Sequence, residues 1–224
     1  MAPSIEHRPA LERLPVDRVV DAGANRGQFA LACRLYLPGI PVHSFEPIPG
    51  EAEVFRAVLG EDDLVRLHGL ALGSERGEAV LNLSARRDSS SLLPIGDEQA
   101  RIFASTEKVG ELRVPVGKLD DFFAEWGDAR AMLLKLDVQG FELSVLKGAG
   151  DTLRRCAYVY CECSEVELYT GQALRAEIEG YLNGMGFARV LRLNETWNGG
   201  SLVQADYLFQ RETRPAGVGS TVVD

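Results

Sequence analysis

The sequence predicts an α/β fold in which a mostly parallel sheet carries helices on both faces. Short apolar runs alternate with segments of helical period along most of the chain, which is the order of elements in a parallel sheet. The run at 131–138 is almost wholly apolar, as expected of a central strand that is buried on both faces. A turn at 198–200 joins the last two strand-like runs, so one strand of the sheet should be antiparallel.

Each predicted element rests on period and on turn residues. The first strand is a short apolar run, and the helix after it ends at Pro38-Gly39, a strong stop signal. The predicted strands lie at 18–21, 42–46, 64–72, 79–83, 112–116, 131–138, 157–163, 187–193 and 202–209. The predicted helices lie at 28–37, 51–59, 142–155 and 172–185.

The stretch at 84–111 interrupts this pattern and is too long and irregular for a plain connection. It is either an ordered insertion over a binding site or a disordered surface loop. We predict a single domain over 1–211 that contains this insertion. From 212 to 224 the chain is rich in Pro and Gly, which predicts a flexible tail.

The composition excludes several classes of partner. A net charge of −9 gives no general attraction to nucleic acid or to an anionic membrane. No segment approaches the ~18 apolar residues of a membrane-spanning helix, and the N-terminus has no signal-peptide core. We therefore expect a cytoplasmic protein.

The cysteines predict buried free thiols rather than a metal site or a disulfide. They lack the paired C-x-x-C spacing, or the matching histidines, of a zinc site. The four are Cys33, Cys156, Cys161 and Cys163.

The loop at 21–27, between the first strand and the first helix, is the first candidate site. Gly23 and Gly27 permit a tight turn and a close approach of the backbone to a ligand. The amides at the helix start suit a carboxylate, and Asp21 at the strand end suits an ammonium group. The spacing is neither the G-x-G-x-x-G dinucleotide pattern nor a P-loop, so it favours a ligand with a free amino-acid end.

Glu46 and Pro47, at the end of the second strand, form the second candidate site. An acidic residue at this place can accept hydrogen bonds from both hydroxyls of a ribose. Together the two sites leave NAD and S-adenosylmethionine (SAM) as the main cofactor candidates. The glycine pattern favours SAM, which carries both an ammonium and a carboxylate.

Lys135 and Asp137 end the apolar strand at 131–138 and form the third candidate site. Ligands of open α/β sheets lie outside the carboxyl ends of the strands, so Asp137 should face the same crevice as Asp21 and Glu46. Lys135 lies two residues earlier on the same face. It is either a catalytic residue or half of a structural ion pair.

Seven segments in order resemble the FkbM family of SAM-dependent methyltransferases, over about 16–211. They are DAGANRGQF, FEPIPGE, ALGSERGEA, SSSLL, KLDVQGFELSVLKGA, ECSEVELYTGQ and QADYLF. The resemblance implies a Rossmann-like class I methyltransferase fold, a seven-stranded, mostly parallel sheet with an antiparallel last strand and helices on both faces. It also implies methyl transfer, usually to a hydroxyl of a sugar or natural product.

The resemblance further assigns roles to the candidate residues. The loop at 21–27 would hold the methionine end of SAM, Glu46 the ribose and the Ala71 region the adenine, with Asp137 facing the methyl-transfer site. Many members carry Glu where this chain has Gln139, which argues against catalysis at that position. The predicted cofactor-binding residues are Asp21, Gly23, Ala24, Asn25, Gly27, Glu46, Pro47, Ala71, Leu72 and Asp137.

Methylation of a hydroxyl requires removal of its proton, and a general base contributes about 10²–10⁴-fold. We predict Asp137 first and Glu162 second, because Glu162 ends the strand at 157–163. His43 and His68 lie within strands and are expected to be satisfied there. A divalent metal on Asp137 and Glu162 could replace the base, but no dedicated ligand set is visible and no metal site is predicted.

The acceptor is expected to be a small molecule or a glycan, and its identity is not encoded in any motif. Ser90 and Ser91 lie in the insertion, Tyr169 and Trp197 can either stack on a sugar or simply pack, and Asp206 is added by the resemblance alone. The short N-terminal segment predicts an almost missing cap, hence an open cleft or help from a partner subunit in a homo-oligomer.

Three alternatives accompany this interpretation. An NAD-dependent oxidoreductase would need the tighter glycine fingerprint. A non-catalytic SAM-binding or scaffold subunit would bind the cofactor without turnover. Methylation of nitrogen is disfavoured because the chain has no Asn/Asp-Pro-Pro-Tyr/Phe motif.

Overall fold

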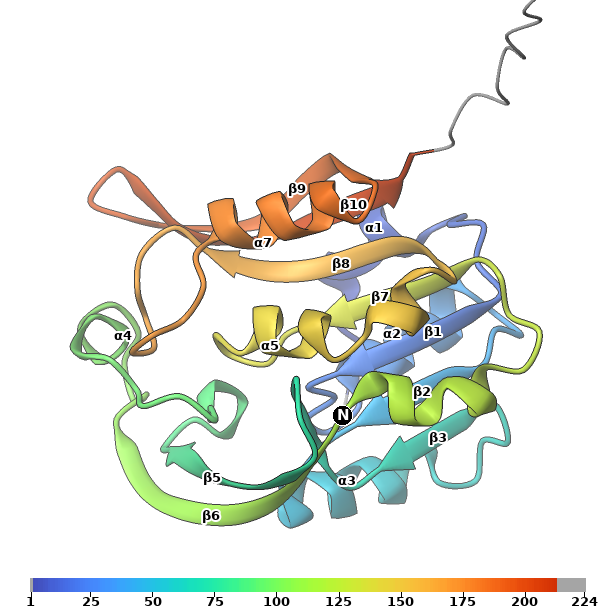
Figure 1. Cartoon of the computed structure of the whole chain (residues 1–224). Helices are drawn as coiled ribbons and strands as arrows, with labels where there is room; N and C mark the ends of the chain where they lie inside the picture. Colours follow the sequence, from blue (N-terminus) through green and yellow to red (C-terminus); the bar gives the residue numbers. More distant parts are fainter. Residues whose placement is uncertain (1, 213–224) are drawn as a thin grey trace, which may run out of the picture.

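The computed structural model describes residues 2–212, and Figure 1 shows a seven-stranded sheet at their centre. The strand order is β3-β2-β1-β7-β8-β10-β9. The first five strands are parallel, whereas β10 runs antiparallel to both of its neighbours. The antiparallel hairpin predicted from the turn at 198–200 is therefore confirmed. The strands are β1 (Arg18–Ala22), β2 (Val42–Phe45), β3 (Val65–His68), β7 (Met132–Leu136), β8 (Cys156–Ser164), β9 (Phe187–Asn198) and β10 (Ser201–Arg211).

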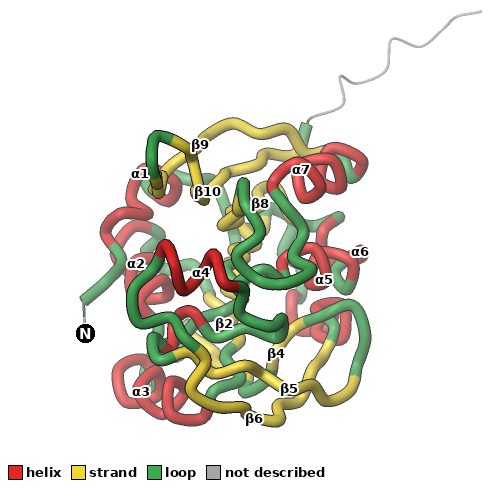
Figure 2. The backbone as a smooth tube through the Cα atoms, turned by 90° about the vertical axis from the view of Figure 1, so that its left-hand side faces the viewer, coloured by secondary structure: helices red, strands yellow, loops and turns green. Residues whose placement is uncertain are grey.

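Helices cover both faces of this sheet, and each face has its own apolar core (Figure 2). One core lies under α1, α2 and α3; the other lies under η3, α5, α6 and α7. The helices are η1 (Ile5–His7), α1 (Arg8–Leu11), α2 (Gln28–Tyr36), α3 (Pro49–Leu59), η3 (Leu119–Trp126), α5 (Glu142–Lys147), α6 (Gly150–Leu153) and α7 (Arg175–Gly184). None of these elements, nor any other helix in the described residues, is long and apolar enough to span a membrane.

The strand predicted at 64–72 is wrong as a single element. Its first part is β3, which pairs with β2, and its last two residues form β4 (Ala71–Leu72) in a second sheet. That sheet has the order β4-β6-β5, with β5 at Gly77–Ser84 and β6 at Lys108–Gly117. The apolar run is continuous in sequence, but its first part pairs with β2 and its last part with β6, so it forms two strands in different sheets.

The helix predicted at 142–155 is also divided, into α5 and α6. Gly148 lies at the break, where a Cβ atom would come within 2.0 Å of the Gly73 carbonyl oxygen. The chain therefore approaches the loop after β4 too closely for any side chain at this position. The break places the end of α5 against that loop.

The insertion at 84–111 is ordered. It contains η2 (Arg87–Ser89) and α4 (Asp97–Ile102), and Figure 2 shows α4 in front of the edge of the main sheet. Ile95 forms an isolated bridge with Tyr169. Apolar side chains of the insertion also pack on Leu168 and Val203. These contacts hold the insertion across the carboxyl edge of the strands.

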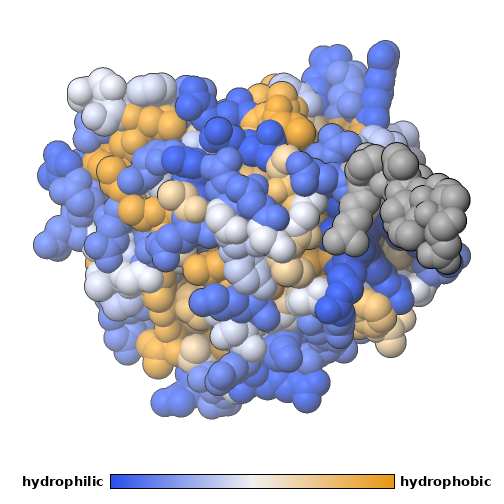
Figure 3. All heavy atoms as spheres, turned by 45° about the horizontal axis from the view of Figure 1, so that its top comes forward, coloured by the Kyte–Doolittle hydropathy of each residue, from blue (hydrophilic) through white to orange (hydrophobic). Residues whose placement is uncertain are grey.

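The surface offers a candidate edge for self-association, although the predicted homo-oligomer stays a prediction. On the face in Figure 3, hydrophobic residues lie in separate groups among hydrophilic ones. The edge strand β9 exposes Val190, Leu191 and Trp197.

All four cysteines are buried and free, as predicted. The predicted tail, beyond Glu212, lies outside the described residues.

Candidate active site

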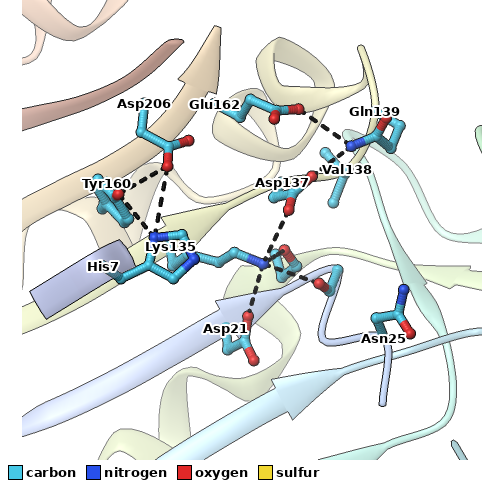
Figure 4. Close-up of polar contacts among 12 residues, drawn as sticks. His7, Asp21, Asn25, Lys135, Asp137, Val138, Gln139, Tyr160, Glu162 and Asp206 are labelled. Carbon is cyan, nitrogen blue, oxygen red and sulfur yellow. Dashed lines mark hydrogen bonds and ion pairs between the residues drawn. The ribbon is translucent and has the colours of Figure 1, made fainter. Parts of the chain in front are cut away.

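The carboxyl ends of β1, β2, β7 and β8 meet at one edge of the sheet, and their polar residues lie in register. Asp21 pairs with Ser44 on one side and with Lys135 on the other, and Lys135 pairs with Tyr160. Successive side chains of a strand point to opposite faces of the sheet, so residues in register share one face. Residues two positions further along the same strands, such as Asp137 and Glu162, lie toward that face as well. Figure 4 shows the resulting polar network.

The loop after β1 depends on two glycines. Gly23 has a φ of +79°, and a Cβ atom there would lie 1.8 Å from the carbonyl oxygen of Asp137. Gly27 has a φ of +96°, and a Cβ atom there would lie 2.9 Å from Phe55 and from Leu59. The first glycine brings the loop against the end of β7; the second seats the start of α2 on α3.

The backbone amides of this loop are already used, which differs from the prediction that they bind a carboxylate. All five N–H groups from Gly23 to Gly27 donate to acceptors within the protein. The acceptors are the Phe45 carbonyl for Gly23 and Ala24, Glu46 Oε2 for Asn25, Asn25 Oδ1 for Arg26, and the Ala24 carbonyl for Gly27. These bonds hold the loop in place, and Gly23 and Asn25 are its members that line a cavity at this edge of the sheet.

Asp21 does not reach the cavity, so the prediction that it binds an ammonium group directly is corrected. Its side chain is fully buried, 3.1 Å from Lys135 Nζ, and it accepts a hydrogen bond from Ser44. Lys135 also donates to the carbonyl of Gly23 at 2.9 Å. Asp21 thus holds the lysine that fixes the glycine loop.

Lys135 forms a buried ion pair with Asp21, which is one of the two roles that the sequence left open. Its side chain is buried and lies 3.7 Å from Asp137 Oδ2 as well as beside Asp21. Burial opposes the charge, but the two carboxylates outweigh it and raise the lysine pKa above its ordinary value. The group is therefore a fixed cation beneath the site.

Glu46 lines the cavity and is oriented by two backbone amides. Its oxygens accept hydrogen bonds from the N–H groups of Asn25 at 2.8 Å and Ile48 at 2.7 Å. Each oxygen keeps a lone pair, so both hydroxyls of a ribose can donate to it. Burial raises the pKa of Glu46 to about 7, with a smaller contribution from neighbouring carboxylates.

The cavity beside Glu46 has a lining that suits a nucleoside. Its space of about 670 Å³, part of it open to solvent, is in the range of small-molecule pockets. The lining includes the apolar residues Ala71 and Leu72, predicted to contact adenine, as well as Asp137. The predicted residues that line it are Gly23, Asn25, Glu46, Pro47, Ala71, Leu72, Ser90 and Asp137. Ala24 and Gly27 shape the loop behind it.

Gln139 joins the two predicted base candidates, and sequence reasoning gave it no role. Its Nε2 donates to Asp137 Oδ1 at 2.6 Å and to Glu162 Oε2 at 3.2 Å (Figure 4). Its Oε1 accepts from the Tyr169 hydroxyl at 2.6 Å. The φ of Gln139 is +54°, a strained value for this residue type, and the contacts of both ends of its amide maintain it.

Asp137 and Glu162 lie in different environments. The Asp137 side chain is 38% exposed and lines the cavity, so a substrate can reach it. Glu162 is partly buried, and desolvation followed by the charge of Asp137 raises its pKa well above the ordinary value. It does not line the cavity, and both of its oxygens accept hydrogen bonds from amide side chains, so it is the less accessible of the two base candidates.

Four residues predicted to contact the acceptor do other work. Ser91 is buried and donates to the Gln139 carbonyl at 2.6 Å. Tyr169 is buried too, and its hydroxyl, which donates to Gln139, lies 3.1 Å from the Ser89 carbonyl as an alternative acceptor. Trp197 lies on the β9 hairpin, donates to Glu195 and does not line the cavity. Asp206 is nine-tenths buried and accepts from Tyr160 at 2.8 Å. Packing decided the outcome for Ser91, Tyr169 and Asp206, because each is buried against a partner inside the protein. Trp197 is exposed on the edge strand.

The N-terminal segment packs on the sheet through His7, next to residues that do not line the cavity. His7 Nδ1 lies 2.9 Å from the Tyr160 hydroxyl and 3.6 Å from Asp206. Its ring also packs edge-on against Phe29 of α2. Because these partners are distant in sequence, only the fold shows that this short segment is seated on the sheet.

Comparisons with known proteins agree with this geometry. The family model described as "Methyltransferase FkbM domain" matches residues 21–188. The 31-O-demethyl-FK506 methyltransferase FkbM of Streptomyces tacrolimicus is 30% identical, over 88% of this chain and 82% of its own length. The 2-O-methyltransferase NoeI of Sinorhizobium fredii is 29% identical, over 77% of this chain and 75% of its own length.

A solved structure supports the fold independently. The precorrin-6y C5,15-methyltransferase of Geobacter metallireducens aligns with a TM-score of 0.50 at 10% identity. The alignment covers 92% of this chain and 86% of that one. The family match leaves no support for the NAD-dependent alternative. The chain belongs to the FkbM family of methyltransferases, has the class I methyltransferase fold and uses SAM as its cofactor.

Proposed function

We propose that this protein methylates a hydroxyl oxygen of a sugar or natural-product acceptor, with Asp137 as the general base. The observation that carries the proposal is the position of Asp137, a carboxylate open to the cavity whose backbone touches the cofactor loop. The names of both curated relatives specify an oxygen position, which supports an oxygen acceptor here.

Bound SAM supplies an electrophilic methyl group, and the protein contributes placement and proton removal. Asp137 accepts the proton of the acceptor hydroxyl as the new O–CH₃ bond forms and the S–CH₃ bond breaks. Gln139 donates to Oδ1, which leaves Oδ2 as the atom that takes the proton. Lys135 Nζ lies 3.7 Å from Oδ2, so a buried positive charge faces that oxygen.

The insertion supplies the far wall of the acceptor space. Arg87 and Asp88 line the cofactor cavity and also a neighbouring polar hollow that includes Arg26 and Arg86. Ser90 faces the same cavity. These polar groups suit a hydroxylated acceptor, because each can exchange a hydrogen bond with it.

The test is transfer of labelled methyl from SAM to a panel of hydroxylated glycans and natural products. Asp137→Asn should lower kcat by about 10²–10⁴-fold while SAM affinity stays close to that of the wild type. Glu162→Gln, which changes a carboxyl that does not line the cavity, is the matched control and should retain most activity. If Asp137→Asn keeps full turnover, Asp137 is not the base.

A non-catalytic SAM-binding subunit is the second candidate, and the same panel distinguishes it. That candidate requires SAM binding with no transfer to any acceptor tested. The single domain over 1–211, the cytoplasmic location and the absence of nucleic-acid partners stay predictions.

A further inference from the structure

Three metal-ligating side chains meet on the sheet face opposite Asp21, away from the cofactor cavity. They are His43 of β2, His68 of β3 and Glu125 of η3, and none of them lines the cavity. His43 Nδ1 lies 3.3 Å from His68 Nε2, and Glu125 Oε2 lies 3.7 Å and 3.8 Å from these two nitrogens. Three elements separated in sequence thus present one ligand atom each to a common point.

The separations match the coordination sphere of a small divalent ion. The point equidistant from the three atoms lies about 2.1 Å from each of them, which is the length of Zn–N and Zn–O bonds. We propose that His43, His68 and Glu125 bind a zinc ion, with a fourth position open to water. Two histidines and one glutamate form a ligand set that zinc accepts in proteins.

The rings that carry the nitrogen ligand atoms are neutral and held in place. Burial, followed by the charges of neighbouring cations, lowers the pKa of His43 to about 4, and burial also lowers the pKa of His68, so both rings are neutral. The His68 ring stacks on Phe45 at 4.6 Å, and the His43 ring meets Trp126 edge-on at 5.1 Å. Packing on these aromatic rings fixes both imidazoles before any ion arrives.

Glu125 supplies the second observation that points to a ligand. Its Oε2 is buried and accepts no hydrogen bond of good geometry. Arg66 Nη1 lies 3.1 Å away as an ion-pair partner, but this arginine is largely exposed and solvent weakens the attraction. A buried acceptor directed at two imidazole nitrogens is the arrangement that a bound cation would satisfy.

One neighbour opposes the ion, and this gives the proposal a distinctive test. Arg18 Nη1 lies 3.0 Å from His43 Nε2, and a guanidinium can only donate, so Nε2 accepts and Nδ1 carries the proton. Zinc must displace that proton, and Arg18 must then turn away from the ring. The Glu125 carbonyl, 3.5 Å from the same Nη1, is an acceptor within reach. Removal of Arg18 should therefore strengthen binding.

The experiment titrates the whole protein, stripped with a chelator, with Co²⁺ as a spectroscopic substitute for Zn²⁺. The wild type should bind one equivalent, give the visible absorption of tetrahedral Co²⁺ and lose it when Zn²⁺ is added. Glu125→Gln and His68→Gln should each weaken Co²⁺ binding by more than about 100-fold. That loss exceeds the effect of changing a residue that contacts only a ligand and not the metal. His7→Gln is the control, because His7 is the one histidine of the chain's three that lies outside the cluster.

Arg18→Met should bind Co²⁺ more tightly than the wild type. Far-UV circular dichroism and SAM titration establish that each variant is folded, and Glu125→Gln is the safer variant because its side chain is partly exposed. No tetrahedral absorption in the wild type would overturn the proposal. So would absorption that survives in folded Glu125→Gln and His68→Gln, or that disappears in His7→Gln.

Discussion

Replacement of Gly23 by alanine tests the contact between the cofactor loop and the end of β7. Gly39, which follows α2, is the matched control: its φ is +84° against +79° at Gly23, and a Cβ atom there would meet nothing within 4 Å. Both substitutions impose the left-handed backbone on an L-residue, at about 1–2 kcal/mol. At Gly23 the new Cβ would also lie 1.8 Å from the Asp137 carbonyl oxygen, far inside van der Waals contact.

The Asp137 carbonyl or the loop must therefore move by more than an ångström. Overpacking of this kind costs about 1–3 kcal/mol, so Gly23→Ala should destabilise by about 2–5 kcal/mol in total. Gly39→Ala should cost no more than the backbone share. Urea unfolding measures both values, and calorimetry should show weakened SAM binding for Gly23→Ala alone. Equal losses of stability in the two variants, within about 0.5 kcal/mol, would refute the close approach.

Three further predictions concern buried charge. Burial raises the pKa of Glu46 to about 7, so the stability of wild type relative to Glu46→Gln should be greatest below the ordinary carboxyl pKa and fall as pH rises through 7. The fall is at most about 3 kcal/mol, measured by urea unfolding at pH 5 and pH 8. Lys135→Met leaves Asp21 charged and alone, which should cost about 3–5 kcal/mol, and adding Asp21→Asn should recover much of it in the same assay. Gln139→Glu should replace two amide hydrogen bonds with repulsion between carboxylates and shift the pH–kcat profile of methyl transfer to higher pH, and an unchanged profile would exclude this role.

Local period and turn chemistry predicted most of the main sheet. The runs that became β1, β2, β7 and β8 are short and apolar, and each is followed by a helix or a turn signal, so little else could form there. Glu46 and Asp137 were predicted as cavity residues for the same reason, because a carboxylate at the end of a parallel strand faces the crevice. Both are strand-end positions, which sequence alone can identify.

Pairing over long distances could not be predicted in the same way. The apolar run at 64–72 contains no signal that its last residues pair with Val116 and Gly117. Asp21 has the sequence signature of a ligand-binding residue, yet Lys135, brought into register by the sheet, takes its carboxylate. Buried charge is retained only with a partner, and the partner is set by the fold.

The polar centre of the site depends on having glutamine rather than glutamate at position 139. With Gln at 139, the amide donates to Asp137 and Glu162 at once and accepts from Tyr169, which ties the end of β7 to β8 and to the loop after β8. A carboxylate at this place could make none of the donations and would leave three acids within hydrogen-bond distance. The neutral amide therefore places a donor between Asp137 and a second acid and bonds to both. On this reasoning Gln139 is a positioning residue, and its effect reaches the reaction through Asp137.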